Sequence, residues 1–426
     1  SFQTALLLFL LLPLLSCLKS DEGSVDWGKD RITSFWNFPM DKCPREYGVT
    51  MPVKEYHINH NKDFWFKGDQ VTTFYEYDHG MFPCIKVTEA TEKMLPTKWY
   101  SVKGGLPQNT NVDEHLAIFK EQIKKALPEN FNGPAIIDVE EWRPMYDQNW
   151  SKKRVYQWES QYLVERKNPH LNNVTDKKQI AEMAKKEFDE AAKNLLLKSL
   201  DLIKQLRPKA KLGMYGFPMC NYDAGQRREL SCSVNYMGHN DELKWLYDKF
   251  DLITPSIYIE ERWLNETYEL SGRYRYIYAL MNESRRMANL YSPPKPIVPF
   301  TKFEYNPYTE DISKHIYYST RDLCNALMTS ANFGSTGLLH WSTNKFIGTH
   351  RCQRIREYFV KTAGPAIDIV RRRFNRCALE RCSNHGRCVN FEPIDGQVCF
   401  FRMRPEDYNC QCDKGYEGDR CEKQRK

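Results

Sequence analysis

Three acidic residues follow an apolar run in the middle of the chain. Residues 132–144 read NGPAIIDVEEWRP, so the run ends in Asp138, Glu140 and Glu141. Successive side chains of a β-strand point to opposite faces, which places Asp138 and Glu140 on one face and Glu141 on the other. Two carboxyl groups on one face repel when both are ionised, so one keeps its proton to a higher pH. We therefore predict that Glu140 is a general acid and that Asp138 shares its proton and orients it.

The same residues also have a structural interpretation. They could form an acid cluster capped by Arg143, or they could bind a metal ion. Magnesium or calcium needs more oxygen ligands than the sequence places nearby, and His57 and His60 lack the glutamate of a zinc-binding helix. The pattern favours carboxyl chemistry, and we expect no metal and no cofactor.

The acid pair alone does not complete an ordinary glycosidase site, because such sites hold a second carboxyl about 5–10 Å away on the opposite face of the sugar. A substrate with an N-acetyl group can replace that carboxyl, since its acetamido oxygen attacks the anomeric carbon. The protein then needs a polar group that holds the acetamide. Tyr215 and Tyr258 both end apolar runs and are candidates. A tyrosine at a strand end is more often a core residue, so both interpretations stay open.

Short apolar runs alternate with longer helical stretches up to residue 342. Seven segments are typical of strands, at 32–37, 71–77, 135–140, 212–217, 252–259, 296–302 and 337–342. The longest helical segment, 177–206, has a predicted core stripe of Ile180, Ala184, Phe188, Ala191, Leu195, Leu202 and Leu206. This alternation predicts an α/β fold, a distorted TIM-type (β/α) barrel with about seven strands, whose pocket lies at the carboxyl ends of the strands. An open doubly wound sheet is the alternative, but no G-x-G-x-x-G follows the first strand.

Length and composition agree with a barrel that carries an appendage. The chain has 426 residues, of which 41% are hydrophobic and 27% charged, and this balance is typical of a folded globular protein. The formal net charge of +7 mildly favours an anionic partner. Charges of both signs are mixed and no nucleic-acid-binding motif occurs, so we expect that the protein does not bind nucleic acid. We also expect a monomer.

Several features are typical of a secreted protein. Residues 1–20 contain an apolar run that is too short to span a bilayer but has the length of a signal-peptide core, and we interpret this signal peptide as truncated at its start. Four N-glycosylation sequons begin at Asn149, Asn173, Asn265 and Asn282. Nothing after Cys421 is hydrophobic, so we expect no membrane anchor. An extracellular location predicts that most of the 14 cysteines form disulfides.

The composition changes after Gly364. A basic stretch at 366–376 is interpreted as a solvated linker after a barrel domain at 21–365, and a cysteine-rich segment at 377–422 follows it. The cysteine spacing of this segment, with Cys399 left out, resembles that of an EGF-like domain. That resemblance implies the disulfides Cys377–Cys388, Cys382–Cys410 and Cys412–Cys421.

Seven motifs occur in order along residues 33–362. They are FWNxP at 35–39, GMFP at 80–83, GGLPQ at 104–108, IDxExWRP at 137–144, YGFPxC at 215–220, PSIY at 255–258 and WS at 341–342. Together they resemble the motifs of the hyaluronidases of glycoside hydrolase family 56. A set of seven ordered motifs is far more specific than any single one.

This resemblance implies retaining endo-hydrolysis of the β-1,4 N-acetylhexosaminide bonds of hyaluronan, with chondroitin as a weaker substrate. The site residues that it implies are Glu140, Asp138 and Tyr258 as catalytic residues, Tyr215 beside Tyr258 at the N-acetyl subsite, Trp341 as the floor, and Arg143 and Tyr75 in the cleft. It also implies the disulfides Cys43–Cys352 and Cys220–Cys232. Of the cysteines left over, we predict that Cys84 pairs with Cys324 and that Cys399 is unpaired.

Two other hypotheses compete with a hyaluronidase. A non-catalytic hyaluronan-binding or adhesion protein could use the same barrel, but the intact Asp138 and Glu140 argue against it. A hydrolase that prefers chondroitin stays open, because recognition of sulfate depends on the shape of the groove.

Overall fold

The computed structural model describes residues 24–171, 176–264, 270–394, 399 and 401–425. The predicted signal peptide at 1–20 and the sequons at Asn173 and Asn265 lie outside the described residues. No helix in the described ranges combines the length and the apolar character needed to cross a membrane.

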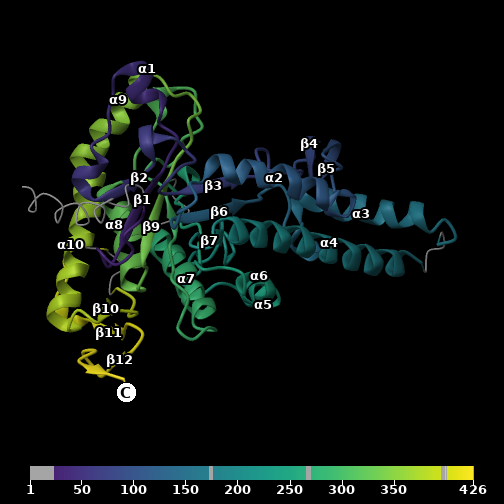
Figure 1. The fold of residues 1–426 in the computed structure, drawn as a ribbon. Coiled ribbons are helices and arrows are strands. Elements are labelled where there is room, and N and C mark those ends of the chain that lie inside the picture. Colours follow the sequence, from purple (N-terminus) through teal and green to yellow (C-terminus); the bar gives the residue numbers. More distant parts are fainter. Residues whose placement is uncertain (1–23, 172–175, 265–269, 395–398, 400, 426) are drawn as a thin grey trace, which may run out of the picture.

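Parallel strands form the centre of the molecule (Figure 1). One sheet has the order β2-β1-β9-β8 and a second has the order β3-β6-β7. The strand bounds are β1 Thr33–Asn37, β2 Ile58–His60, β3 Thr72–Tyr75, β6 Pro134–Asp138, β7 Lys211–Met214, β8 Phe300–Thr301 and β9 Gly337–Trp341. Six of the seven predicted segments overlap one of these strands, and the short β2 adds a strand that the sequence pattern does not predict.

The seventh predicted segment, 252–259, connects the two sheets without forming a regular strand. Its isolated bridges are Ile253 with Ile297, Ser256 with Phe300, and Thr254 with Phe217. Pro255 has no amide hydrogen to donate, which interrupts a regular ladder at this point. The bridges nevertheless place the segment between β7 and β8, which gives the succession of a distorted (β/α) barrel.

The barrel interior is a packed core, not a channel. One cluster of buried side chains comprises Val25, Phe35, Val71, Ile136, Leu252, Val298, Phe300 and Leu339. Between β2 and β3 the side chain of Asn61 bonds the backbone of Val71 in both directions, at 2.7 and 3.0 Å. Since the interior is filled, a ligand can enter only at the end of the barrel, where the strands run out.

Helices surround the strands. Their bounds are α1 Lys42–Tyr47, α2 Val112–Ala126, α3 Arg154–Lys167, α4 Asp176–Leu206, α5 Val234–Glu242, α6 Lys244–Tyr247, α7 Leu270–Ala288, α8 Thr320–Asn332 and α9 Thr349–Tyr358. The predicted helix at 177–206 agrees with α4, but its predicted stripe is right only in part. Ala192 is buried in place of Ala191, and Leu202 and Leu206 are half-buried, because α4 packs against both α2 and α3.

An antiparallel hairpin interrupts the alternation of strands and helices. It consists of β4 Cys84–Ala90 and β5 Pro96–Val102. Figure 1 shows this hairpin together with α3 and much of α4 extending away from the barrel to one side. The sequence pattern does not predict this projection.

The linker predicted at 366–376 is a helix. These residues lie within α10 Gly364–Arg381, which buries Ile367, Val370 and Phe374. Arg371 of the basic run pairs with Asp30 at 2.9 Å, so this charge holds the helix to the start of the chain instead of facing solvent. The prediction was wrong because alternating basic and apolar residues also fit an amphipathic helix.

The structure contains all five disulfides that the resemblances implied, namely Cys43–Cys352, Cys220–Cys232, Cys377–Cys388, Cys382–Cys410 and Cys412–Cys421. The predicted pair Cys84–Cys324 is wrong. Cys324 on α8 bonds Cys399, and Cys84 is a buried free thiol at the start of β4. The reason is that α8 packs against α10 and β10, which brings the cysteine-rich segment to Cys324.

Two small sheets and a short 3-10 helix at Pro405–Asp407 follow α10 in the described part of the chain. β10 Gly386–Val389 pairs with β11 Asn409–Cys412, and β12 Tyr416–Glu417 pairs with β13 Lys423–Gln424. The EGF-like identity of this segment stays a prediction.

Candidate active site

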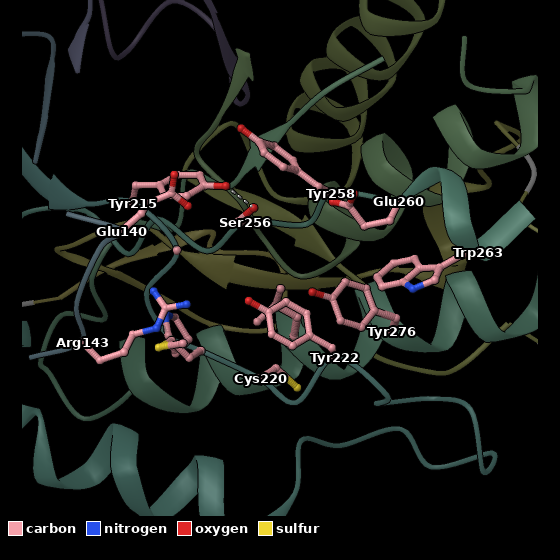
Figure 2. A pocket seen from close by; sticks show the side chains of 14 residues that line it. Glu140, Arg143, Tyr215, Cys220, Tyr222, Ser256, Tyr258, Glu260, Trp263 and Tyr276 are labelled. Carbon is pink, nitrogen blue, oxygen red and sulfur yellow. Dashed lines mark hydrogen bonds between the residues drawn. The ribbon is translucent and has the colours of Figure 1, made fainter. Parts of the chain in front are cut away.

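The strand ends bring all seven predicted site residues to one cleft. Two adjoining pockets share Glu140, Tyr215, Tyr258 and Glu260, so they form one continuous cleft with Glu140 in both halves. Figure 2 shows the first half. The first half also contains Arg143, and the second also contains Tyr75, Asp138 and Trp341. The carboxyl ends of parallel strands meet at the same edge, which explains this gathering.

The alternation along β6 separates the three acids as predicted. Asp138 and Glu140 line the cleft, whereas Val139 between them is buried in the apolar core. Glu141 turns to the hairpin, where it pairs with Lys86 at 2.5 Å and accepts a hydrogen bond from the Tyr77 hydroxyl. Glu141 is therefore occupied in holding the hairpin and does not face the cleft.

Burial favours the protonated form of the acid pair. It raises the pKa of Asp138 well above its ordinary value, and the nearby charges of Glu140 and Glu76 act in the same direction. Loss of solvent in the cleft also raises the pKa of Glu140, although the positive charges of Arg143 and Lys153 oppose this. The pair can therefore hold one proton at a pH where isolated carboxyls have lost theirs.

A third buried carboxyl, Glu76, lies behind the pair and was missed by the sequence analysis. Its side chain is 2% exposed overall, and burial raises its pKa to about 7. Its Oε2 accepts a 2.8 Å hydrogen bond from the backbone amide of Glu140. Glu76 directly follows the apolar strand β3, just as Asp138 stands at the end of an apolar run. The same sequence pattern could therefore have identified it.

Aromatic rings form the wall of the half-cleft that contains Asp138. The Trp341 ring stacks on Tyr258 with centroids 5.8 Å apart, and its indole nitrogen donates a 2.7 Å hydrogen bond to the Tyr75 hydroxyl. The Tyr215 ring is tilted at 45° to the Tyr258 ring, with centroids 6.0 Å apart, and its hydroxyl shares a 3.1 Å hydrogen bond with Ser256. Such apolar ring faces suit the faces of pyranose rings, and the hydroxyls suit their polar substituents.

Two buried polar atoms point to where a ligand would bind. Within the described part of the chain, neither Asp138 Oδ1 nor the Tyr258 hydroxyl has a hydrogen-bond partner. A buried polar atom without a partner costs free energy, and active sites commonly retain such atoms for the substrate. Both atoms belong to residues that line the same half of the cleft.

The other half of the cleft is also aromatic. Figure 2 shows Tyr222, Tyr276 and Trp263 in this region, with the Arg143 side chain on the same side as Glu140. The sequence pattern does not mark these three aromatic residues, because none directly follows a predicted strand and none lies in a motif. A guanidinium beside aromatic rings suits an anionic sugar.

Asn149 is a buried residue that holds the Arg143 loop. Its Oδ1 accepts a 2.8 Å hydrogen bond from the Arg143 amide, and its Nδ2 donates to the carbonyls of Arg143 and Met145 at 3.2 and 2.8 Å. The residue is 0% exposed. This burial contradicts the predicted glycosylation of Asn149, because the amide nitrogen that would carry the glycan is enclosed. Asn282 is exposed, so its sequon stays a prediction.

The cleft offers carboxyl, hydroxyl and aromatic groups but no preformed metal centre. Across the described residues, no group of three or more His, Cys, Asp or Glu side chains is placed to hold a metal ion.

Comparisons with known proteins agree with this geometry. The sequence model of the family described as Hyaluronidase matches residues 27–414. A protein named Chondroitin hydrolase from Caenorhabditis elegans is 32% identical over 424 residues, which cover 98% of this chain and 86% of that protein. A Hyaluronidase from Loxosceles intermedia is 31% identical over 406 residues, which cover 92% of this chain and 94% of that protein.

A solved structure also matches. Bee venom hyaluronidase in complex with a hyaluronic acid tetramer superposes with a TM-score of 0.68 and 25% identity, covering 79% of this chain and 98% of that one. The fold is therefore the distorted barrel predicted from the alternation of strands and helices. Because the family model spans most of the chain, this protein is a glycosidase of the hyaluronidase family.

Proposed function

We propose that this enzyme hydrolyses the β-1,4 N-acetylhexosaminide bonds of hyaluronan, with retention of configuration. The observation that carries the proposal is that Asp138, at the end of β6, and Glu140, just beyond it, both line the cleft with raised pKa values, beside the aromatic wall of Trp341 and Tyr258. A binding protein would have no need for two buried acids that share a proton.

Glu140 acts as the general acid in this proposal. It lies where the two halves of the cleft meet, so a sugar chain that fills both halves presents its scissile bond to this carboxyl. Glu140 gives its proton to the leaving oxygen, and Asp138 keeps the proton on the pair until the sugar arrives. Afterwards Glu140 takes a proton from the water that attacks the anomeric carbon.

The acetamido oxygen of the substrate supplies the nucleophile in this proposal. It attacks the anomeric carbon from the other face of the ring and forms a cyclic intermediate, which water then opens. The Tyr258 hydroxyl, which has no partner among the described residues, is suited to hold the acetamide, with Tyr215 beside it. Double displacement by this route retains the configuration.

Chondroitin is the second candidate substrate. It is favoured by the relative named Chondroitin hydrolase, which matches 98% of this chain. Hyaluronan and unsulfated chondroitin differ in the orientation of one hydroxyl on the N-acetylhexosamine, so both carry the acetamide that the mechanism requires. We expect chondroitin to be cleaved more slowly.

The experiment is the release of reducing ends from purified hyaluronan, unsulfated chondroitin and sulfated chondroitin at equal concentrations. Release from hyaluronan by the wild-type enzyme, and none by Glu140→Gln, would support the proposal. Faster release from chondroitin would reverse the order of the substrates. Binding of hyaluronan without any release would favour the adhesion protein instead.

The setting of the reaction belongs to the same proposal. Six disulfides in the described part of the chain favour an oxidising, extracellular environment, where hyaluronan occurs. We infer that the protein is secreted and acts as a monomer. Analytical ultracentrifugation of the secreted protein tests whether it is a monomer.

A further inference from the structure

A loop at residues 306–315 forms part of the cleft wall. Tyr308 on this loop lines the same half-cleft as Trp341, and the two ring centroids are 6.3 Å apart. Backbone hydrogen bonds join the two ends of the loop, from the Tyr305 amide to Ile316 at 3.0 Å and from the Tyr318 amide to Phe303 at 2.8 Å. The position of Tyr308 therefore depends on what holds the loop between these ends.

A buried charge cluster lies at the base of this loop. Glu304, His315, Arg351 and Ser342 are all 1% exposed or less. The Glu304 carboxylate accepts hydrogen bonds from Ser342 Oγ at 2.5 Å and from Arg351 Nη2 at 3.0 Å. Ser342 directly follows Trp341, so the cluster connects both walls of the half-cleft.

Glu304 is ionised in this cluster. Burial opposes its ionisation, but the hydrogen bond from His315, the charge of Arg351 and the bond from Ser342 outweigh it and lower the pKa of Glu304 below its ordinary value. A guanidinium can only donate hydrogen bonds, so the carboxylate is the acceptor.

The His315 ring lies between two acceptors. Its Nδ1 is 3.2 Å from Glu304 Oε1, and its Nε2 is 2.9 Å from the carbonyl oxygen of Thr309. A neutral imidazole has one donor nitrogen, so it satisfies only one of these contacts, whereas an imidazolium donates from both. We propose that His315 is a positioning residue, held doubly protonated between Glu304 and Thr309, which fixes the loop that presents Tyr308 to the sugar.

The charged groups around His315 are of both signs. Helix α9 contributes Arg351 and also Arg354, which donates a 3.0 Å hydrogen bond to the His315 carbonyl. The segment after β8 contributes Glu304 and Lys302, whose Nζ donates to the Tyr305 carbonyl at 2.9 Å. The loop itself contributes the exposed pair of Lys314 and Asp311, 3.4 Å apart. Of these charged groups, Glu304 is the one in direct contact with the ring, so the second ring proton depends on it.

Deprotonation of His315 has a defined consequence. The neutral ring loses either the bond to Glu304 or the bond across the loop to Thr309, so Tyr308 is held less firmly. Substrate binding should then weaken as the pH rises, while the proton transfer at Glu140 is unaffected by this step. This inference rests on the proposed function, because it takes a sugar as the ligand of Tyr308.

The kinetic test compares His315→Gln with His350→Gln on hyaluronan oligosaccharides. His350 is the matched control, since it is an exposed histidine on α9 next to Arg351. The Gln amide donates from its nitrogen only and carries no charge. We expect KM of His315→Gln to rise about tenfold at acidic pH, the worth of about one hydrogen bond, with kcat changed less than about threefold. KM of the wild-type enzyme should rise with pH relative to that of His315→Gln, and His350→Gln should behave as wild type.

A second measurement needs no activity and no variant. Hydrogen–deuterium exchange at the histidine C2 position, followed by mass spectrometry, reports ring protonation against pH. Trypsin releases residues 315–321 as HIYYSTR, whose single histidine is His315. A ring that is doubly protonated at acidic pH supports the proposal. A ring that is neutral throughout, or a folded His315→Gln enzyme with wild-type KM and pH profile, would overturn it. If the wild-type enzyme cleaves no hyaluronan, the proposed function fails, while the exchange still tests the state of His315.

Discussion

The backbone amide of Glu140 donates a 2.8 Å hydrogen bond to the Glu76 carboxylate, and the backbone amide of Glu76 donates a 3.0 Å hydrogen bond to the carbonyl of Asp138. Glu76 therefore holds the backbone on both sides of Val139. This clamp fixes how far Glu140 reaches into the cleft, and it places a third carboxyl behind the acid pair.

Replacing Glu76 should separate its geometric role from its charge. In Glu76→Gln the side-chain oxygen still accepts the Glu140 amide, so kcat should fall less than about tenfold, whereas Glu76→Ala breaks the clamp and should lose about 10²-fold or more. Loss of the charge should also lower the pKa of Asp138, which Glu76 now raises, and shift the alkaline limb of the pH–rate profile to lower pH. Equal losses of kcat in Glu76→Gln and Glu76→Ala would contradict the role of the Glu76 side chain in holding the Glu140 backbone.

The pH dependence of stability should also change in Glu76→Gln. Burial raises the folded-state pKa of Glu76 from 4.5 to about 7. The folded state therefore binds this proton more tightly than the unfolded state, so its contribution is fully present below pH 4.5 and is lost as the pH rises to about 7. The free energy of unfolding, measured by urea denaturation at several pH values, should fall more across this window for wild type than for Glu76→Gln.

Glu140→Gln and Glu141→Gln should differ strongly in turnover. The first removes the proton donor, and general acid catalysis is worth about 10²–10⁴-fold, so turnover should fall by at least that factor with oligosaccharide binding retained. The second leaves an amide beside Lys86 and Tyr77 and should cost less than about tenfold, mainly through the hairpin. Reducing-end release and a binding assay check both. If Glu141→Gln were the inactive one, the assignment from strand alternation would be wrong.

Glu260 tests whether the substrate supplies the nucleophile. It lines both halves of the cleft and lies 3.5 Å from Lys302, so it is a carboxyl distant in sequence from the acid pair that an ordinary glycosidase could use. With an acetamide nucleophile, Glu260→Gln should keep turnover within about tenfold of wild type. A loss as large as that of Glu140→Gln, together with a trapped glycosyl-enzyme in the mass spectrum, would instead identify a protein nucleophile.

Of the two sequons in the described residues, the one at Asn282 should carry a glycan and the one at Asn149 should not. Asn282→Gln should remove a glycan and raise the electrophoretic mobility of the secreted protein, because Asn282 is exposed. Asn149→Gln should leave the mobility unchanged and reduce activity, because its buried amide holds the Arg143 loop. A mobility shift at Asn149 with full activity would show that the loop is arranged differently in the secreted protein.

Truncation at Gly364 should prevent secretion of a folded enzyme. It removes α10, whose Ile367, Val370 and Phe374 are buried, and it also removes the disulfide between Cys399 and Cys324. The paired substitution of Cys324 and Cys399 by serine is the matched control, because it cuts only the covalent tether and should retain activity with a lower melting temperature. An active truncated barrel would show that α10 is dispensable.

Local patterns in the sequence determined the acid pair. The alternation along 135–140 places Asp138 and Glu140 on one face and Glu141 on the other, and the structure agrees because the strand period depends only on backbone geometry. The alternation of apolar runs and helical stretches likewise determined the barrel, since each element needs a partner for its apolar face. The motifs and the family resemblance then indicated Tyr215, Tyr258, Trp341 and Tyr75 as residues of the cleft, and all four line it.

Contacts between distant segments were decided only by the tertiary structure. Cys324 pairs with Cys399 because α8 packs against the end of the chain, and spacing alone does not encode that proximity. A sequon marks Asn149 as a glycan site, but the packing around the Arg143 loop encloses it. Glu76 and Glu304 carry no motif, because each takes its role from a partner far along the chain, at residues 140 and 351. His315 carries none either, because it takes its role from its contact with the buried Glu304. The sequence thus specifies which face a side chain takes within its own element, and packing specifies what that face meets.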